Sequence, residues 1–417
     1  METLTVNMRN FIGPPYWTCP KCGADTFGVM FINRDSYMRR CRDCWHKADF
    51  RLPKLKKKII YLDQFVVSEI MKLNDPIAKG HASVAADPFW SELDELLRKL
   101  RNLQLICCPA SGEHENESLL SPFFANLKKT YENLSGGVAF ESGNAIKVQQ
   151  VAALAKAWAR GTNPEFSFEA SRITHGELHG WNNKFYVTTS SYKEQYVDTL
   201  REEREELHDG ITGVFNNSWK INKLSFAEWY DLEKNSHQKY MLRNVKIRHE
   251  KRMKLVTTPW LLSLDDALYS ESENMVRMIL NVINRETRSN DKTNPDELRN
   301  SFFTEFRMAD APFNKIGAAM YASIAIKAAG GQKKPPNRGM VADIEIVSTL
   351  LPYCDAMFMD NGCRAILQDI PQSHRPEGVD RVYSMNCKVE FLDYLRTIRA
   401  SASPEHLELV KQVYGER

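Results

Sequence analysis

Four cysteines near the N-terminus have the residue type and spacing of a metal site. Cys19 and Cys22 form one CxxC pair, Cys41 and Cys44 form a second, and eighteen residues separate the two pairs. Each CxxC turn directs two thiolates toward one point, and four sulfurs close a tetrahedron around Zn²⁺ that leaves no coordination position open for chemistry. The spacing therefore predicts a structural zinc ion.

The segment between the two pairs predicts a β-hairpin. Phe27, Val29 and Phe31 alternate with other residues before the turn-forming stretch 33–36. The order of knuckle, hairpin and knuckle resembles a zinc ribbon, over about residues 14–50. Cations crowd the second knuckle and either face phosphate groups or form a solvated rim: Arg39, Arg40, Arg42, His46 and Lys47.

Acidic residues follow three apolar segments further along the chain. Residues 59–62 are apolar at every position and precede Asp63, residues 103–108 precede Glu113 and Glu117, and residues 356–359 precede Asp360. Uninterrupted apolar runs of this length favour strands of a parallel sheet covered on both faces. Because the carboxyl ends of parallel strands share one edge, these acids are expected to converge there. Asp343 begins a helical stretch before the third strand and is expected over the same edge.

Converging carboxylates call for neutralising protons or cations, since like charges repel. Oxygen ligands of this kind suit Mg²⁺ or Mn²⁺, which activate water and stabilise the leaving oxygen of a phosphodiester. The chemistry expected of such a site is hydrolysis that needs no protein nucleophile.

The order of these acids resembles the acidic quartet of PIN-domain nucleases, and residues 342–344 and 358–361 carry the closest likeness. The resemblance implies metal-dependent cleavage of RNA, or less often DNA, by Asp63, Asp343, Asp360 and a glutamate. Glu113 is the first choice for the glutamate and Glu117 the second. The predicted fold is α/β, a parallel-sheet PIN-like domain in two segments, 59–125 and 313–398, joined by a large insertion at 126–312.

A structural reading of the acids stands beside the catalytic one. Asp and Asn favour helix N-caps and turns, so Asp343 and Asp360 are also explained by capping alone. Asp355, at the start of the third strand, is expected to lie far from Asp360. The alternative function is a non-catalytic adaptor that binds nucleic acid or protein through the ribbon and a basic helix.

That basic helix belongs to the insertion, which is expected to be mostly helical. Residues 148–158, 196–207 and 226–252 have helical character with little Pro or Gly. Cations at helical spacing predict contacts with RNA or single-stranded DNA, although a solvated helix explains them nearly as well: Arg243, Lys246, Lys251 and Lys254. In zinc proteases of the HExxH type a glutamate directly follows the first histidine, but here Gly176 follows His175. The segment therefore predicts two ordinary histidines, His175 and His179. Residues 399–417 predict a C-terminal helix.

Composition predicts a folded chain, with 43% hydrophobic and 26% charged residues among 417. The net charge of +3 means that attraction to nucleic acid must come from local patches. No signal sequence or membrane-length apolar run is evident, which predicts a cytoplasmic location. A nuclease with such a ribbon and insertion would, by analogy of architecture, suit a toxin or defence role under a regulatory protein partner.

Overall fold

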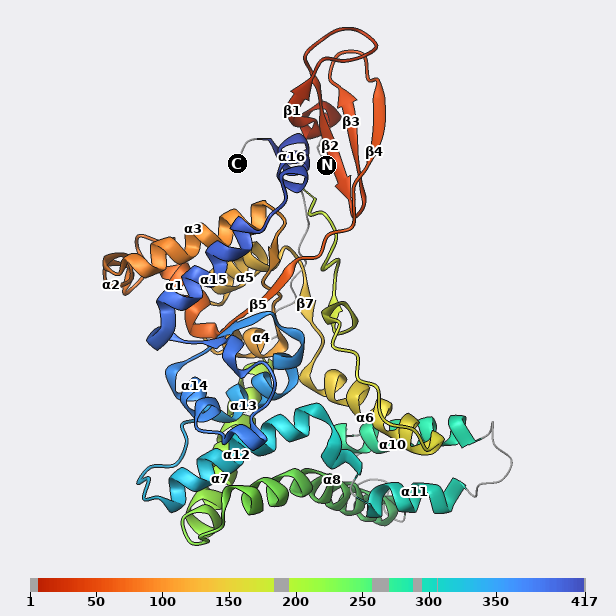
Figure 1. Ribbon diagram of the computed structural model, residues 1–417, viewed down its shortest axis with the longest axis vertical. Coiled ribbons are helices and arrows are strands. Elements are labelled where there is room, and N and C mark those ends of the chain that lie inside the picture. The colour runs from red at the N-terminus through yellow and green to blue at the C-terminus, as the bar shows by residue number, and fades with distance from the viewer. Residues whose placement is uncertain (1–6, 184–194, 257–269, 288–294, 306, 416–417) are drawn as a thin grey trace.

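The computed structural model describes residues 7–183, 195–256, 270–287, 295–305 and 307–415. A small antiparallel sheet stands at one end of the elongated chain, a parallel sheet flanked by helices lies in the middle, and further helices form the other end (Figure 1). The fold is thus mixed α/β, with a parallel sheet and many helices, as the sequence predicted.

The N-terminal sheet has the order β1-β2-β3-β4 and is antiparallel throughout. Its strands are β1 (Gly13–Trp17), β2 (Phe27–Asn33), β3 (Ser36–Cys41) and β4 (Lys47–Arg51). The predicted hairpin is confirmed, with Asn33 opposite Ser36 and Arg34 at a φ of 42° in the turn. One face packs on the C-terminal helix α16 (Pro404–Tyr414), where Val29 and Ile32 join Val410 and Val413 in a shared core.

The parallel sheet has the order β10-β9-β5-β6. Its strands are β5 (Lys58–Leu62), β6 (Ile106–Cys107), β9 (Ala356–Phe358) and β10 (Val382–Tyr383). Residues 59–62 and all of β9 are buried, which confirms the expectation of strands covered on both faces. The second strand is shorter than predicted, because helix α3 (Pro88–Asn102) runs to Asn102 and Gln104 turns the chain at a φ of 59°.

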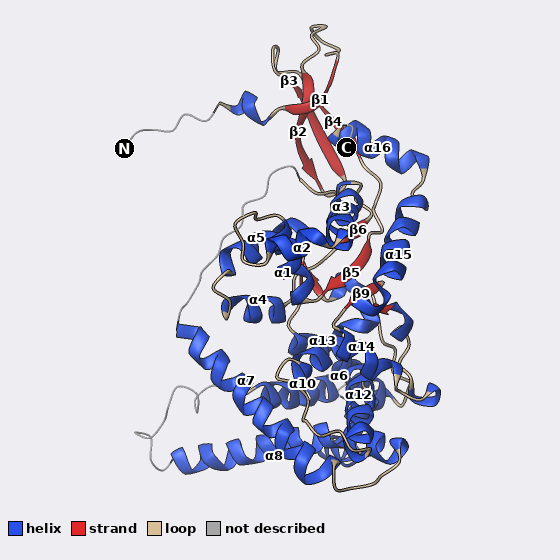
Figure 2. Cartoon of the chain, turned by 90° about the vertical axis from the view of Figure 1, so that its left-hand side faces the viewer, coloured by secondary structure: helices blue, strands red, loops and turns tan. Residues whose placement is uncertain are grey.

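Alternate residues of the strands enter two separate cores, as strand geometry requires. Ile60, Leu62 and Phe358 face one core, and Tyr61 and Met357 face the other. Figure 2 shows the central strands with helices around them. The first core is covered by α1 (Gln64–Leu73), α3, α5 (Phe124–Ser135) and α15 (Lys388–Ala400), the second by α12 (Pro312–Ala329), α13 (Met340–Leu350) and α14 (Asn361–Gln368).

The middle of the chain is mostly helical where it is described. It contains α6 (Gly143–Arg160), α7 (Gln195–Val214), the π-helical turn η3 (Phe215–Trp219), α8 (Phe226–Val256), α10 (Glu271–Thr287) and α11 (Pro295–Thr304). Part of it has its own core, which includes Leu154, Met241, Ile279 and Phe302. Two short strands, β7 (Ala139–Phe140) and β8 (Thr174–His175), form a separate antiparallel pair. The domain boundaries drawn from the sequence stay a prediction.

The remaining helices are short. They are α2 (His81–Ala86), α4 (Gly112–Leu119), η1 (Met8–Phe11), η2 (Ala170–Arg172), η5 (Arg307–Asp310), η6 (Leu351–Tyr353), η7 (Gln372–His374), η8 (Val379–Arg381) and η9 (Met385–Cys387). Among the described helices, none combines the length and apolar character needed to cross a bilayer.

Candidate metal centre and acidic site

The four cysteines lie on two turns at the end of the antiparallel sheet. Cys19 and Cys22 lie in the turn that follows β1, Cys41 ends β3, and Cys44 lies in the turn before β4. The first turn is closed by the Gly23 N–H, which donates to the Cys19 carbonyl at 2.9 Å, and Gly23 adopts a φ of 75° that glycine accommodates without strain. Local sequence therefore places each pair, and the β2-β3 hairpin brings the pairs together.

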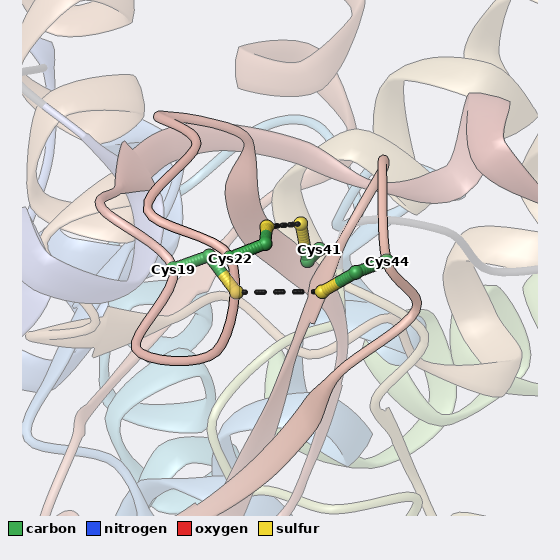
Figure 3. A group of neighbouring side chains, drawn as sticks. All are labelled: Cys19, Cys22, Cys41 and Cys44. Atoms are coloured by element: carbon green, nitrogen blue, oxygen red, sulfur yellow. Dashed lines mark hydrogen bonds between the residues drawn. The ribbon is translucent and has the colours of Figure 1, made fainter.

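The sulfur positions fit a tetrahedral metal ion. The four Sγ atoms lie within 4.8 Å of one another, and the pairs Cys19–Cys44 and Cys22–Cys41 are each separated by 3.6 Å (Figure 3). A Zn–S bond of about 2.3 Å implies S···S separations of about 3.8 Å in a regular tetrahedron. The cysteines are not joined as disulfides. The cluster can therefore hold a metal ion such as zinc.

The environment of Cys41 favours the thiolate form that a metal requires, whereas that of Cys22 does not. Although a hydrogen bond from the Ala24 backbone acts to lower it, contacts with the thiols of Cys44, Cys19 and Cys41 raise the pKa of Cys22 to about 12. Although burial acts to raise it, hydrogen bonds from the backbone of Cys44 and Asp43 and from the Thr26 hydroxyl lower the pKa of Cys41 to about 6. The Thr26 hydroxyl lies 3.4 Å from the Cys41 sulfur. Such second-shell contacts orient a ligand and stabilise its charge.

The acids that follow β5 and β9 meet at one edge of the parallel sheet. Leu62 pairs with Phe358 across the two strands, and the Asp63 N–H donates to the Phe358 carbonyl at 3.0 Å. Asp63 and Asp360 therefore leave neighbouring strands at the same end. Asp355 lies at the opposite end, where it accepts hydrogen bonds from the Ile59 N–H and Lys58, as the sequence analysis expected.

Helix capping accounts for one of these acids and not for the others. Asp360 caps α14 by accepting a hydrogen bond from the Cys363 N–H at 2.5 Å. Asp63 occupies the N-cap position of α1, but its side chain makes no capping hydrogen bond. Asp343 lies in the first turn of α13, which begins at Met340, so the helix starts earlier than predicted and Asp343 is inside it. Asp63 and Asp343 are thus available for another role.

Burial and repulsion by neighbouring acids oppose the ionisation of the Asp63 and Asp343 carboxyl groups. Burial, then Glu117 and Asp360, raise the pKa of Asp63 to about 7, against hydrogen bonds from the backbone of Gln64 and Asp360 that lower it. Burial, then Asp63, Asp360 and Glu117, raise the pKa of Asp343 to about 8. No basic side chain forms an ion pair with Asp63, Asp343 or Asp360 in the part of the chain that the structure describes. Negative charge here needs a cation or protons.

The structure distinguishes the two candidate glutamates. Both lie on α4 and are partly buried, whereas Glu115 between them is exposed. Glu117 raises the pKa of both Asp63 and Asp343. The pKa of Glu113 is raised by burial first and then by Glu345 and Glu117, and none of the three aspartates contributes to it. We therefore define the acidic group as Asp63, Glu117, Asp343 and Asp360, and the choice between Glu113 and Glu117 as the catalytic glutamate stays a prediction.

The carboxylates interact without being drawn tightly together. Among the described residues, only the four cysteines form a set of three or more potential ligands whose atoms all lie within 4.8 Å of one another. The acids are thus near enough to shift one another's pKa but more widely spaced than the sulfurs, as expected for like charges.

His114 positions helix α4 and was missed by the sequence analysis. Its Nδ1 accepts a hydrogen bond from the Ser111 N–H at 3.1 Å, so Nε2 carries the proton and donates to the Leu62 carbonyl at 2.8 Å. The ring stacks between Tyr61 and Tyr131 and is 2% exposed, and burial lowers the pKa of His114 to about 4. This neutral histidine ties α4 to the residue that precedes Asp63. A histidine three residues after a capping serine was the available signal.

A cavity of about 1170 Å³ opens beside the acidic group. Its charged lining includes Glu113, Glu117, Lys147, Arg204, Arg338 and Glu345. Glu117 lines the cavity directly, and Ala342 beside Asp343 also does. Arg204 pairs with Glu117 at 3.3 Å, and Lys147 pairs with Glu345 at 2.5 Å. Glu117 is thus the member of the acidic group that lines this space, and Asp63, Asp343 and Asp360 do not line it.

The predicted nucleic-acid contacts lie elsewhere. Arg243, Lys246 and Lys251 are exposed on α8, at the end of the molecule away from the N-terminal sheet (Figure 1), and Lys246 approaches Glu250 at 4.0 Å. The side chain of Lys254 lies outside the described residues. None of the three described cations lines the cavity beside the acids. His175 pairs with Glu141 and His179 accepts from the Lys57 N–H, so both have ordinary structural partners.

Comparison of the chain with protein-family models, with curated proteins and with solved structures gave no match.

Proposed function

We propose that the protein is a metal-dependent nuclease that hydrolyses phosphodiester bonds, with RNA as the favoured substrate. The observation that carries the proposal is the gathering of Asp63, Asp343 and Asp360 at the carboxyl edge of a parallel sheet, with Glu117 beside them. The resemblance of these acids to the PIN-domain quartet supports the same assignment.

The acidic group fits a divalent cation by the chemistry of its donors. Its members offer carboxylate oxygens, the ligands that Mg²⁺ and Mn²⁺ prefer. Because the pKa values of Asp63 and Asp343 are raised, both carboxyl groups ionise near neutral pH only when a cation lies beside them. A bound Mg²⁺ or Mn²⁺ would supply activation of water and stabilisation of the leaving oxygen.

The residues of the chain have distinct tasks in this proposal. Asp63 and Asp343 provide buried charge whose solvation by water is already reduced, so a cation gains more from them than from exposed acids. Asp360 is held in one orientation by its hydrogen bond from the Cys363 N–H. His114 holds α4 so that Glu117 stays next to Asp63. The cysteine cluster has no open ligand position and is assigned a structural role.

The test is cleavage of single-stranded RNA and DNA with Mg²⁺ or Mn²⁺ by the parent chain and by Asp63→Asn and Asp360→Asn. Asparagine retains N-capping ability at position 360, so that variant keeps its helix start. The matched control is Asp369→Asn, at the opposite end of the same helix α14. The proposal expects a loss of about 100-fold or more in each site variant, by analogy with the removal of one charge-stabilising group from an active site, and none in the control.

Equal cleavage by the parent and both site variants would contradict the proposal. The adaptor function would then remain, with the ribbon and the exposed cations of α8 as its binding surfaces. Contamination is excluded if activity follows the parent chain and not the two variants through the same purification.

A further inference from the structure

A basic side chain from the insertion faces the acidic group. Arg204 on α7 places its Nη2 atom 3.3 Å from Glu117 Oε1. The two residues are 87 positions apart, and their side chains are 34% and 24% exposed. Arg204 acts on Glu113 as well, whose negative charge it favours. The Arg204 guanidinium therefore interacts with both Glu113 and Glu117 of α4.

Two other cations of the cavity lining, which also includes Arg201, have partners outside the acidic group. Lys147 pairs with Glu345, and Arg338 pairs with Glu205 on α7 at 3.6 Å. Of the three ion pairs made by Lys147, Arg204 and Arg338, the pair of Arg204 joins the insertion to a member of the acidic group. Its position is at the boundary between the acids and the cavity.

A divalent cation and Arg204 compete for the same carboxylate. When a cation binds Glu117, the attraction between Glu117 and the guanidinium is shared and weakens. A partly buried guanidinium then requires another anion, and its planar fork matches phosphate oxygens bidentately. A phosphodiester in the cavity beside the acids would supply them.

We propose that Arg204 is a substrate-binding residue, paired with Glu117 in the cation-free protein and with a phosphate oxygen of single-stranded RNA in the cavity of the cation-loaded protein. This inference rests on the proposed function of the acidic group. It assigns a binding task to helix α7, so the insertion completes the site rather than only covering it.

The first measurement is Mn²⁺ binding to the full chain with its cysteine cluster loaded. Arg204→Gln removes the competing cation and is expected to tighten Mn²⁺ binding about threefold, which corresponds to the free energy of a partly exposed ion pair. Arg204→Lys keeps the charge and is expected to stay near the parent. Arg338→Gln, which removes a cation from the same cavity but not from Glu117, is expected to leave the Mn²⁺ affinity unchanged.

The second measurement is binding of a fluorescent oligouridylate, with Ca²⁺ replacing Mn²⁺ to slow cleavage. Loss of one charged hydrogen-bonding pair predicts about tenfold weaker binding for Arg204→Gln, and Arg204→Lys should recover part of it. The slope of log affinity against log salt should fall by about 0.7 for one lost contact with a single strand. An oligodeoxyuridylate arm shows whether the contact is with the phosphate or depends on ribose.

Three outcomes would overturn the inference. Unchanged oligonucleotide affinity and salt slope in Arg204→Gln would mean that Arg204 does not contact substrate. Weaker Mn²⁺ binding in that variant would make Arg204 a support for Glu117 and not a competitor. If the parent binds no Mn²⁺ other than at the cysteine cluster, both the proposed function and this inference are wrong. If the parent cleaves RNA and Arg204→Gln binds Mn²⁺ and oligonucleotide like the parent, only this inference is wrong.

Discussion

The two clusters of potential metal ligands in this protein are built in opposite ways. The cysteines come from residues 19–44, and their sulfur atoms lie within 4.8 Å of one another. The acids come from residues 63–360, and they meet only because β5 and β9 are neighbours in the parallel sheet. The cysteine cluster depends on two turns and a hairpin, whereas the acidic group depends on the whole central fold.

The clusters also differ in what surrounds them. In the cysteine cluster, hydrogen bonds favour the thiolate of Cys41, whereas the neighbouring thiols oppose that of Cys22. In the acidic group, burial and like charges oppose the ionisation of Asp63 and Asp343, and Arg204 pairs with Glu117. Four cysteines that leave no ligand position open suit a permanent structural ion. A site that resists ionisation suits a cation that binds with the reaction.

The largest expected effect is the loss of the cysteine-bound metal. Metal binding at a structural zinc site contributes about 10–16 kcal/mol to folding in small zinc domains, so Cys41→Ser is expected to unfold residues of the N-terminal sheet. Because that sheet shares a core with α16, the C-terminal helix should loosen as well. Limited proteolysis with zinc analysis measures both, and Cys387→Ser, far from the cluster, is the control.

A protease-resistant N-terminal sheet in a Cys41→Ser protein that has lost its metal would break the comparison. It would show that the core shared with α16 holds the antiparallel sheet without a metal ion.

The next effect concerns the tie between α4 and β5. His114→Ala removes two hydrogen bonds and two stacking contacts from a fully buried position and is expected to cost about 3–4 kcal/mol in the free energy of unfolding. Because Glu117 would no longer be held beside Asp63, divalent-cation binding should weaken too. Chemical denaturation and Mn²⁺ titration test the two effects.

Glu115→Ala, on the exposed side of the same helix, serves as the control. A His114→Ala protein that loses stability yet binds Mn²⁺ like the parent would show that α4 does not position the acidic group.

The pH dependence of stability is expected to be smaller in size but specific in sign. The pKa values of Asp63 and Asp343 rise from 3.8 to about 7 and about 8 in the folded chain. The folded state then binds more protons than the unfolded state across this window, so these groups lower stability as pH rises from about 4 to about 8. Mg²⁺ should restore the loss at the upper end.

Thermal unfolding of the zinc-loaded chain across this pH window, with and without Mg²⁺, measures the effect. Asp63→Asn is expected to flatten the dependence and to remove part of the Mg²⁺ stabilisation. A parent whose unfolding temperature does not respond to Mg²⁺ at high pH would contradict a divalent site at the acids.

The smallest expected effect is on α8. If Arg243, Lys246 and Lys251 contact phosphate, each neutral substitution should reduce the salt slope of single-strand binding by about 0.7 without altering Mn²⁺ affinity. Fluorescence anisotropy at several salt concentrations tests this. Lys315→Gln, outside this face and paired with Asp310, is the control, and equal slopes in all variants would make the α8 cations a solvated surface.

Much of the framework was predictable from local patterns. The apolar run at 59–62, the helices at 148–158 and 226–252, and the hairpin at 27–41 all depend on residue spacing within one element. The exact extent of β6 was not, because the turn that follows α3 takes Leu103 and Gln104, which the prediction had placed in the strand. The start of α13 at Met340 was also hidden, since its N-cap residue is Gly339, which has no side chain, and the Met340 N–H donates instead to Asn337 Oδ1 at 2.8 Å.

By itself, the sequence determined which cysteines cluster, the residue at which β5 ends and, to within one residue, the end of β9. These features depend on turns and periodicities that neighbouring residues control. Tertiary structure alone decided that Glu117 acts on the pKa of Asp63, that His114 holds its helix, and that Arg204 pairs with Glu117. Each of these depends on how elements far apart in the chain pack together, and burial and charge act between groups that only packing makes neighbours.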